Sequence, residues 1–151
     1  MKLAEALIIR AETMKHISQL SERLRDNALV QEGEKPEENP AELLNVLQLE
    51  IGELELLIYR INHTNNQTSS PEAQSIMLLL AKRDALTLYV SVLRSFISRS
   101  SQRFERNSAR EIRIESAIDT TKLRIMLDSK SKELRELEMK IQQLNWTTDL
   151  L

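Results

Sequence analysis

The side chains best suited to chemistry in this sequence are arginines, and six of them gather in one segment. From Arg94 to Arg113 the chain carries six arginines against two glutamates, a local net charge of +4. Guanidinium groups and the interleaved serines can bind phosphate, and Phe96 or Phe104 could stack on a base. The segment therefore predicts a candidate nucleic-acid patch made of Arg94, Arg99, Arg103, Arg106, Arg110 and Arg113. The alternative is that this basic stretch meets an acidic loop, such as residues 32–38, on a neighbouring subunit.

A second group of charged residues stands where a helix needs apolar ones. Arg10, Arg83 and Lys130 occupy positions of an apolar seam, and Asp84 or Glu53 could neutralise them. Buried charges need partners and often mark a function, but charged seam residues also fix helix register and oligomer order. We interpret Arg10, Arg83, Asp84 and Lys130 as a register-setting polar network. Ligand binding, or side chains that reach water along the seam edge, are the alternatives.

Metal and nucleophilic chemistry find little support in the sequence. Di-iron helical bundles use Glu-x-x-His, but the residues three before the two histidines are Thr13 and Arg60. Glu12 and His16 could share one ion, yet no further ligands are evident, so a solvated Glu–His pair is the preferred interpretation. The chain has no Cys and no Gly-x-Ser-x-Gly, Walker or dinucleotide-binding motif. We expect no enzyme activity, no metal and no cofactor.

The composition indicates long helices as the elements that hold these residues. Only 2 Gly and 3 Pro occur in 151 residues, about 3% of the chain where an average protein has roughly 12%. So few turn residues exclude many-stranded sandwiches and barrels. The net charge of -2 argues against a generally basic nucleic-acid binder.

Two helices are predicted in the first half of the chain. Residues 3–27 carry a seam that alternates steps of four and three: Leu3, Leu7, Arg10, Met14, Ile17, Ser21 and Leu24. After an acidic loop, Asn39 and Pro40 predict the cap and first position of a second helix that runs to about residue 65. Its seam is Leu44, Leu47, Ile51, Leu54, Ile58 and Ile61. Further leucines at 43, 49, 56 and 57 indicate neighbours on more than one side. Gly52, inside this helix, predicts a close helix–helix approach.

Two more helices are predicted in the second half. Ser70 and Pro71 should start a helix that runs to about residue 106, with a seam at Leu79, Arg83, Leu86, Val90, Leu93, Ile97, Ser100 and Phe104. Asp119 should cap the last helix, with a seam at Leu123, Leu127, Lys130, Leu134, Leu137, Ile141 and Leu144. Residues 110–118 alternate polar and apolar side chains, which predicts a small two-stranded β ribbon with residues 28–31.

These elements predict a mainly all-α fold: long antiparallel helices in a coiled-coil-like bundle that forms a single domain over residues 1–151. Glu5 and Arg10 interrupt the apolar N-terminal run before a signal-peptide core could form. No apolar stretch approaches the roughly 18 residues of a membrane helix. We therefore expect a cytoplasmic protein that does not bind a membrane.

Several short motifs resemble those of a family of small bacterial proteins described as septicolysin-like, and also as a domain of unknown function. They are Met1–Ile8, Asn27–Glu34, Asn39–Pro40, Ile61–Asn65, Arg83–Leu86 and Leu144–Leu151. The resemblance covers essentially the whole chain, and the two terminal motifs are its most specific parts. It implies an all-helical bacterial protein with no established reaction, and its label implies a cytolysin.

The leading functional hypothesis is a structural or interaction protein that acts as a homo-oligomer or with an unknown protein partner. Four helices carry more apolar positions than one narrow seam can bury, so the surplus needs partners. A nucleic-acid-associated module that uses Arg94 to Arg113 is the first alternative. A cytolysin, as the family label implies, is the second.

Overall fold

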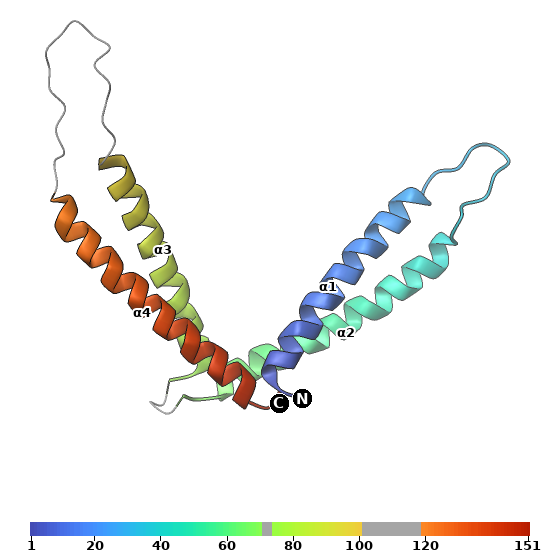
Figure 1. The fold of residues 1–151 in the computed structure, drawn as a ribbon. Helices are drawn as coiled ribbons and strands as arrows, with labels where there is room; N and C mark the ends of the chain where they lie inside the picture. The colour runs from blue at the N-terminus through green and yellow to red at the C-terminus, as the bar shows by residue number, and fades with distance from the viewer. Residues whose placement is uncertain (71–73, 101–118) are drawn as a thin grey trace, which may run out of the picture. The chain divides into compact units, whose positions relative to one another are not determined.

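The computed structural model describes residues 1–70, 74–100 and 119–151. These residues form four α-helices (Figure 1): α1 Leu3–Asp26, α2 Pro40–Gln67, α3 Ile76–Ser100 and α4 Thr120–Thr147. The prediction of a mainly all-α fold is confirmed. The β ribbon is not shown: residues 28–31 form an irregular connection, and the expected partner strand, 110–118, lies outside the described residues.

Capping side chains start α2 and α4 where the sequence predicted. The Oδ1 of Asn39 accepts a hydrogen bond from the Ala41 N–H at 3.0 Å. The Oδ1 of Asp119 accepts from the N–H groups of Thr121 and Lys122 at 3.0 and 3.2 Å. Each cap satisfies amides that have no partner inside the first helical turn.

The predicted start of α3 at Ser70 and Pro71 is wrong. The Ser70 N–H donates to the Gln74 carbonyl at 2.7 Å, and Ser69 and Ser75 form an isolated antiparallel bridge. The Ser70 hydroxyl accepts from the Gln74 N–H, so it serves a turn and does not cap a helix. The helix begins only at Ile76, whose N–H donates to the Thr68 carbonyl at 3.1 Å.

The described residues form two compact units. The first unit comprises residues 1–77 and 142–151, and the second comprises residues 78–141. α1 and α2 run antiparallel within the first unit (Figure 1). The segments of α3 and α4 in the second unit are linked by the Tyr89 hydroxyl to the Met126 sulfur at 3.3 Å, and by Lys82 to Glu133 at 3.9 Å. The prediction of a single domain over residues 1–151 stays a prediction.

The first unit has its best-formed core where the two ends of the chain meet (Figure 1). Leu3, Ile61, Thr64 and Ile76 are at most 1% exposed there. The Leu3 N–H donates to the Thr148 carbonyl at 2.9 Å, and the Leu150 N–H donates to the Met1 carbonyl at 3.0 Å. The two chain ends therefore stabilise each other within this unit.

Buried positions alternate steps of three and four in all four helices. In α3 and α4 the predicted seams over the described residues are the positions that the structure buries or half-buries. In α2, and in α1 from Met14 onward, alternate predicted seam positions are shifted by one residue. α1 buries or half-buries Leu3, Ala4, Ala6, Leu7, Arg10, Thr13, Ile17, Leu20 and Leu24. The corresponding seam of α2 consists of Leu43, Leu47, Glu50, Leu54, Leu57, Ile61 and Thr64. We call the α2 set its inner seam.

Candidate interaction surface

The four residues of the predicted polar network are divided between the two units. Arg83 lies in the second unit and pairs with its sequence neighbour Asp84, with Nη2 and Nε at 2.6 and 2.9 Å from Oδ1. The side chains of Arg83 and Asp84 are 36% and 67% exposed, so this is a surface pair. Lys130, also in the second unit, pairs with Glu133 at 2.8 Å. Arg10 lies in the first unit. A register-setting role for these residues stays a prediction.

The Lys130–Glu133 pair affects the ionisation of both groups. The hydrogen bond from the Lys130 ammonium, followed by its charge, lowers the pKa of the Glu133 carboxyl, and the same bond raises the pKa of Lys130. Both side chains are about 40% exposed. Exposed ion pairs contribute little to stability, so this contact favours a local geometry more than it stabilises the fold.

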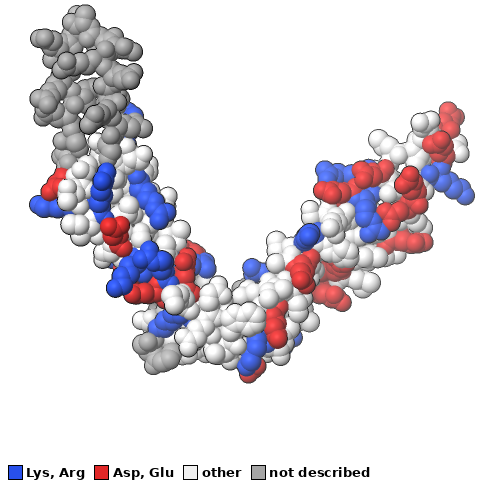
Figure 2. Space-filling model, in the orientation of Figure 1, with Lys and Arg blue, Asp and Glu red and all other residues white. Residues whose placement is uncertain are grey.

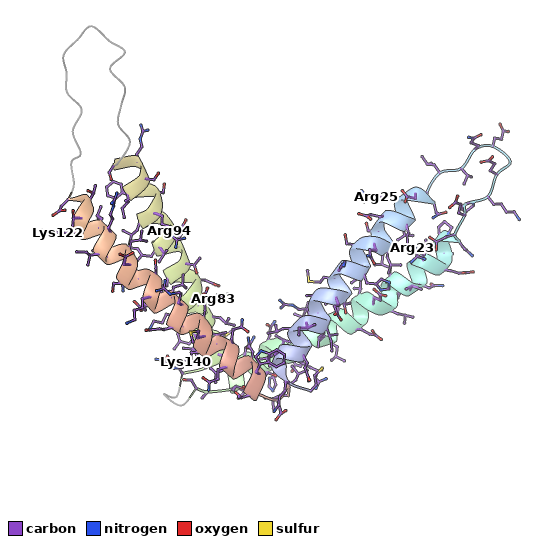
Figure 3. The ribbon with its side chains drawn as sticks, in the orientation of Figure 1. Arg23, Arg25, Arg83, Arg94, Lys122 and Lys140 are labelled. Carbon is purple, nitrogen blue, oxygen red and sulfur yellow. The ribbon has the colours of Figure 1, made fainter. Side chains whose placement is uncertain are left out.

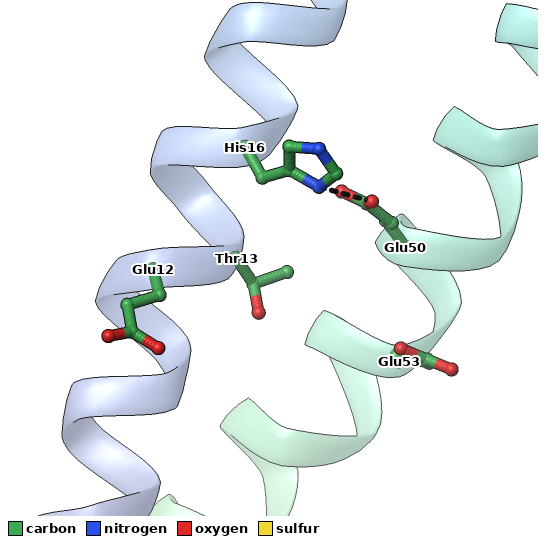
Figure 4. Close-up of a pocket in the computed structure, with 5 residues that line it drawn as sticks. All are labelled: Glu12, Thr13, His16, Glu50 and Glu53. Atoms are coloured by element: carbon green, nitrogen blue, oxygen red, sulfur yellow. Dashed lines mark ion pairs between the residues drawn. The ribbon is translucent and has the colours of Figure 1, made fainter.

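Arg10 and Glu50 are half-buried polar residues in the seams of α1 and α2. The Nε of Arg10 is buried and has no hydrogen-bond partner among the described residues, and the same holds for the Oε2 of Glu50. The other carboxylate oxygen of Glu50 pairs with the Nδ1 of His16 at 2.6 Å (Figure 4). Sequence reasoning missed Glu50 because it placed Ile51 in the seam. The signal that could have found it is the seam through Leu47, Glu50 and Leu54.

The weighed metal pair, Glu12 and His16, lines an open hollow with Thr13, Glu50 and Glu53 (Figure 4). The imidazole of His16 is engaged with Glu50 of the other helix. The described part of the chain holds no group of three or more side chains able to bind a metal ion. The hollow therefore offers a polar surface between two helices.

The candidate basic patch is described only at its start. Arg94 and Arg99 lie exposed on α3, and Figure 3 shows Arg94 on that helix. Arg103, Arg106, Arg110 and Arg113 lie outside the described residues. Figure 2 shows charges of both signs spread along both units on the face drawn. A nucleic-acid role for this patch stays a prediction.

Helix α2 exposes many apolar side chains on the described surface. Seven large apolar side chains of this helix are between 37% and 71% exposed: Leu44, Val46, Leu49, Ile51, Leu56, Ile58 and Tyr59. Between Leu43 and Ile61 no residue of α2 is buried. A helix that is apolar on several sides normally packs against several neighbours. Within the first unit α1 packs along α2, and the C-terminal Leu151 contacts only its last turns. The expectation of helical neighbours on more than one side stays a prediction.

A second seam runs along α2 on the side opposite the inner seam. Its members again alternate steps of four and three, and we call them the outer seam: Asn45, Leu49, Gly52, Leu56, Tyr59 and His63. All six are exposed, and Leu49 is the most exposed large apolar residue of the helix at 71%. The rings of Tyr59 and His63 are stacked, with centroids 6.0 Å apart. A shallow hollow lined by Asn45, Gln48, Leu49 and Gly52 lies on this seam.

The predicted close helix approach at Gly52 does not occur within the described chain. A Cβ added at Gly52 would have no atom within 4 Å. Glycine in the middle of a helix costs about 1 kcal/mol relative to Ala. Helix α2 therefore has this glycine at a position where no contact of the described chain requires it.

No helix among the described residues is long and apolar enough to cross a membrane.

Comparisons with known proteins give a family but no activity. A family of unknown function, DUF6847, matches residues 10–150. The chain is also similar to a functionally unknown conserved protein from Corynebacterium diphtheriae, known from a crystal structure. The two share 37% sequence identity over 100% of this chain and 99% of that chain, with a TM-score of 0.93. No curated protein matches the sequence.

The resemblance to septicolysin-like proteins is therefore wrong. Both the family match and the similar crystal structure carry descriptions of unknown function, and neither points to a septicolysin-like family. The cytolysin hypothesis depended on that resemblance alone and is withdrawn with it. The match over residues 10–150 shows that the chain belongs to the family of unknown function DUF6847.

Proposed function

We propose that the protein is a non-enzymatic interaction protein that acts as a homo-oligomer, with the exposed apolar surface of α2 at the contact. The observation that carries this proposal is the absence of any buried residue between Leu43 and Ile61 of α2, a stretch rich in large apolar side chains. Within the first unit, the middle of α2 is covered by α1 alone, and domains normally bury apolar surfaces between layers.

The exposed area is large enough to drive association. Fully burying one Leu or Ile contributes about 1.5 to 3 kcal/mol, so a half-exposed one retains on the order of 1 kcal/mol. A contact between two helices covers one face, and three of the seven side chains share the face opposite α1: Leu49, Leu56 and Tyr59. They offer roughly 3 kcal/mol per copy, or about 6 kcal/mol for a symmetric pair. The association itself costs an estimated 4 to 15 kcal/mol, so this balance supports a weak, reversible complex.

Light scattering coupled to size-exclusion chromatography tests the proposal. The expected result is a mass above that of the 17.5 kDa monomer, with the oligomer fraction rising between about 5 and 200 µM protein as mass action requires. Because the proposed contact is apolar, the oligomer should persist as salt is raised. A single monomeric species at the highest concentration would overturn the proposal.

A further inference from the structure

We propose that a second copy of the chain docks on the outer seam of α2, so that the two α2 helices lie side by side, parallel and in register at Gly52. This inference rests on the proposed self-association and adds the contact surface and its geometry. The surface is the set Asn45, Leu49, Gly52, Leu56, Tyr59 and His63.

The spacing of the outer seam is that of a helix which packs on two sides. Residues three and four apart share one face of a helix, so Asn45, Leu49, Gly52, Leu56 and Tyr59 form one stripe. At 100° per residue this stripe lies nearly opposite the inner seam. The inner seam packs against α1 within the first unit, whereas the outer seam is exposed along its whole length. The helix therefore has two seams of the same period, and only one has a partner in the described chain.

Gly52 marks the point of closest approach. It stands at the middle of the stripe, with Leu49 and Leu56 on either side. The open space around it means that the described chain does not require a glycine there. A second helix that crosses at this point would gain from the missing side chain, because the two backbones could approach closely. The close approach that the sequence predicts is thus assigned to the contact between copies.

The charges beside the seam favour a parallel pair of identical helices. Gln48 and Glu55 follow one edge of the outer seam, and Glu53 and Arg60 follow the other. In a parallel pair in register, each edge residue faces the opposite edge of its partner five positions further on. Glu55 then faces Arg60 of the second copy, and Gln48 faces Glu53. An antiparallel pair would instead bring the two Glu53 side chains together.

The polar members of the stripe agree with this register. A parallel arrangement sets Asn45 beside Asn45 of the second copy, and a single amide pair in an apolar seam is a known determinant of helix register. Arg60 is available for its new contact, because only its Nε is used in the hydrogen bond to the Leu151 carbonyl oxygen at 2.9 Å.

The size of the contact sets the expected affinity. α2 is about 42 Å long and roughly 10 Å wide. This footprint is smaller than the roughly 800 Å² per partner of a standard interface, so we expect a dimer that dissociates at micromolar concentration.

Charged substitutions on the outer seam test the surface. Leu49→Glu and Gly52→Glu should each weaken the dimer at least tenfold in sedimentation equilibrium. The matched control is Leu88→Glu on α3, because Leu88 has nearly the same exposure, 67% against 71% for Leu49. Circular dichroism should show unchanged helicity in all three variants, since each side chain points into open space. Unchanged association of both outer-seam variants would overturn the proposed surface.

Single-cysteine variants test the orientation without interference, because the chain has no Cys. A disulfide needs Cα atoms within about 7 Å. Oxidised Leu49→Cys protein should form disulfide dimers with itself, and so should Leu56→Cys, while Leu88→Cys stays monomeric on a denaturing gel. Linkage only between Leu49→Cys and Leu56→Cys in a mixture would overturn the parallel arrangement. A dimer by light scattering with no link at either position would overturn the outer seam and leave self-association standing, whereas a wild-type monomer at 200 µM would overturn both.

Discussion

Arg10 and Glu50 show how a helix pair can bury polar atoms in its seams without satisfying each of them. The Arg10 Nε and the Glu50 Oε2 are buried, and neither has a hydrogen-bond partner among the described residues. A buried polar atom without a partner costs about 1 to 3 kcal/mol. These two atoms therefore reduce the stability of the first unit, which fits the predicted register-setting role of Arg10 better than a stabilising one.

We predict that Arg10→Met raises the free energy of unfolding by about 1 kcal/mol, since it replaces an unsatisfied polar atom with an apolar chain of similar length. Urea denaturation followed by circular dichroism measures the change. Arg25→Met on the exposed side of α1 is the control and should stay within about 0.5 kcal/mol of the wild type. A loss of more than about 1 kcal/mol in Arg10→Met would show that the guanidinium stabilises the fold.

Glu38 gives the first unit a stability that depends on pH. Its carboxylate accepts hydrogen bonds from Arg23, and this contact, followed by the charge of Arg23, lowers the pKa of Glu38. A carboxyl whose pKa is lower in the folded state stabilises the fold above its unfolded pKa, and the contribution is lost as pH falls through the folded pKa. The contribution should thus be complete at neutral pH and decline below about pH 4.3.

Melting temperatures of the wild type and Glu38→Gln between pH 7 and pH 3 check this prediction. We expect the wild type to melt higher at pH 7 and the difference to shrink steadily below the ordinary glutamate pKa. Other carboxyls titrate in both proteins, so only the difference between the two curves reports on Glu38. A difference that is constant over the whole range would contradict the assignment.

At the scale of the helices, the sequence predicts the existence of each element well and the buried face less evenly. The seams of α3 and α4 follow from their apolar spacing, although α3 also carries exposed apolar side chains on its other faces: Met77, Leu78, Leu88, Tyr89, Val92 and Phe96. α2 carries apolar residues on nearly every side, so its period alone does not decide whether Leu43 or Leu44 faces α1. Packing against α1 decides it, and that contact is not a local property of the sequence.

The start of α3 was missed for a different reason. Ser-Pro is a frequent helix start, but the Ser70 N–H and hydroxyl are both engaged with Gln74 in a turn. The bridge between Ser69 and Ser75 pairs residues on either side of that turn. This tertiary arrangement outweighs the local capping signal. The candidate site was predicted only in outline, since the sequence indicated a second neighbour of α2 but not the outer seam that would receive it.

The neighbouring leucines of α2 test the observed seam. Leu43 is 5% exposed and Leu44 is 54% exposed. Leu43→Ala should lower the free energy of unfolding by about 2 to 5 kcal/mol, because it removes buried methyl groups and leaves a cavity. Leu44→Ala should cost less than about 1 kcal/mol. Denaturant unfolding measures both free energies, at a protein concentration where the chain is monomeric. Equal losses of unfolding free energy in the two variants would contradict the assigned seam.

At the scale of the whole chain, the first unit is closed by its own two ends. Lys2 pairs with Asp149 at 2.8 Å, and hydrogen bonds join Met1 and Leu3 to the segment 148–150. Helix α2 holds the same segment, because the Leu151 N–H donates to the hydroxyl of Thr64 at 3.0 Å. Residues far apart in sequence thus share one small core, and the local spacing of apolar residues does not report such a contact.

Thr64 is the residue on which this closure can be tested most directly. It is 0% exposed, and its hydroxyl both accepts from the Leu151 N–H and donates to the Arg60 carbonyl at 2.8 Å. Thr64→Val keeps the shape but leaves the Leu151 N–H without its acceptor, so we expect a loss of about 1 to 3 kcal/mol. Thr87→Val is a matched control, because the exposed Thr87 makes the same 2.8 Å bond to the carbonyl four residues earlier and accepts no bond from a distant segment.

Hydrogen exchange at the Leu151 amide separates a local effect from a general one. In Thr64→Val this amide and its neighbours from residue 148 onward should exchange faster than in the wild type, whereas α3 should keep its protection. Thr87→Val should leave both regions unchanged, because its lost bond is local to an exposed helix. If Thr64→Val were as stable as the wild type and equally protected at residues 148–151, the chain ends would be held by apolar burial alone. The hydrogen bond between Thr64 and Leu151 would then follow from the packing of the core and would not stabilise it.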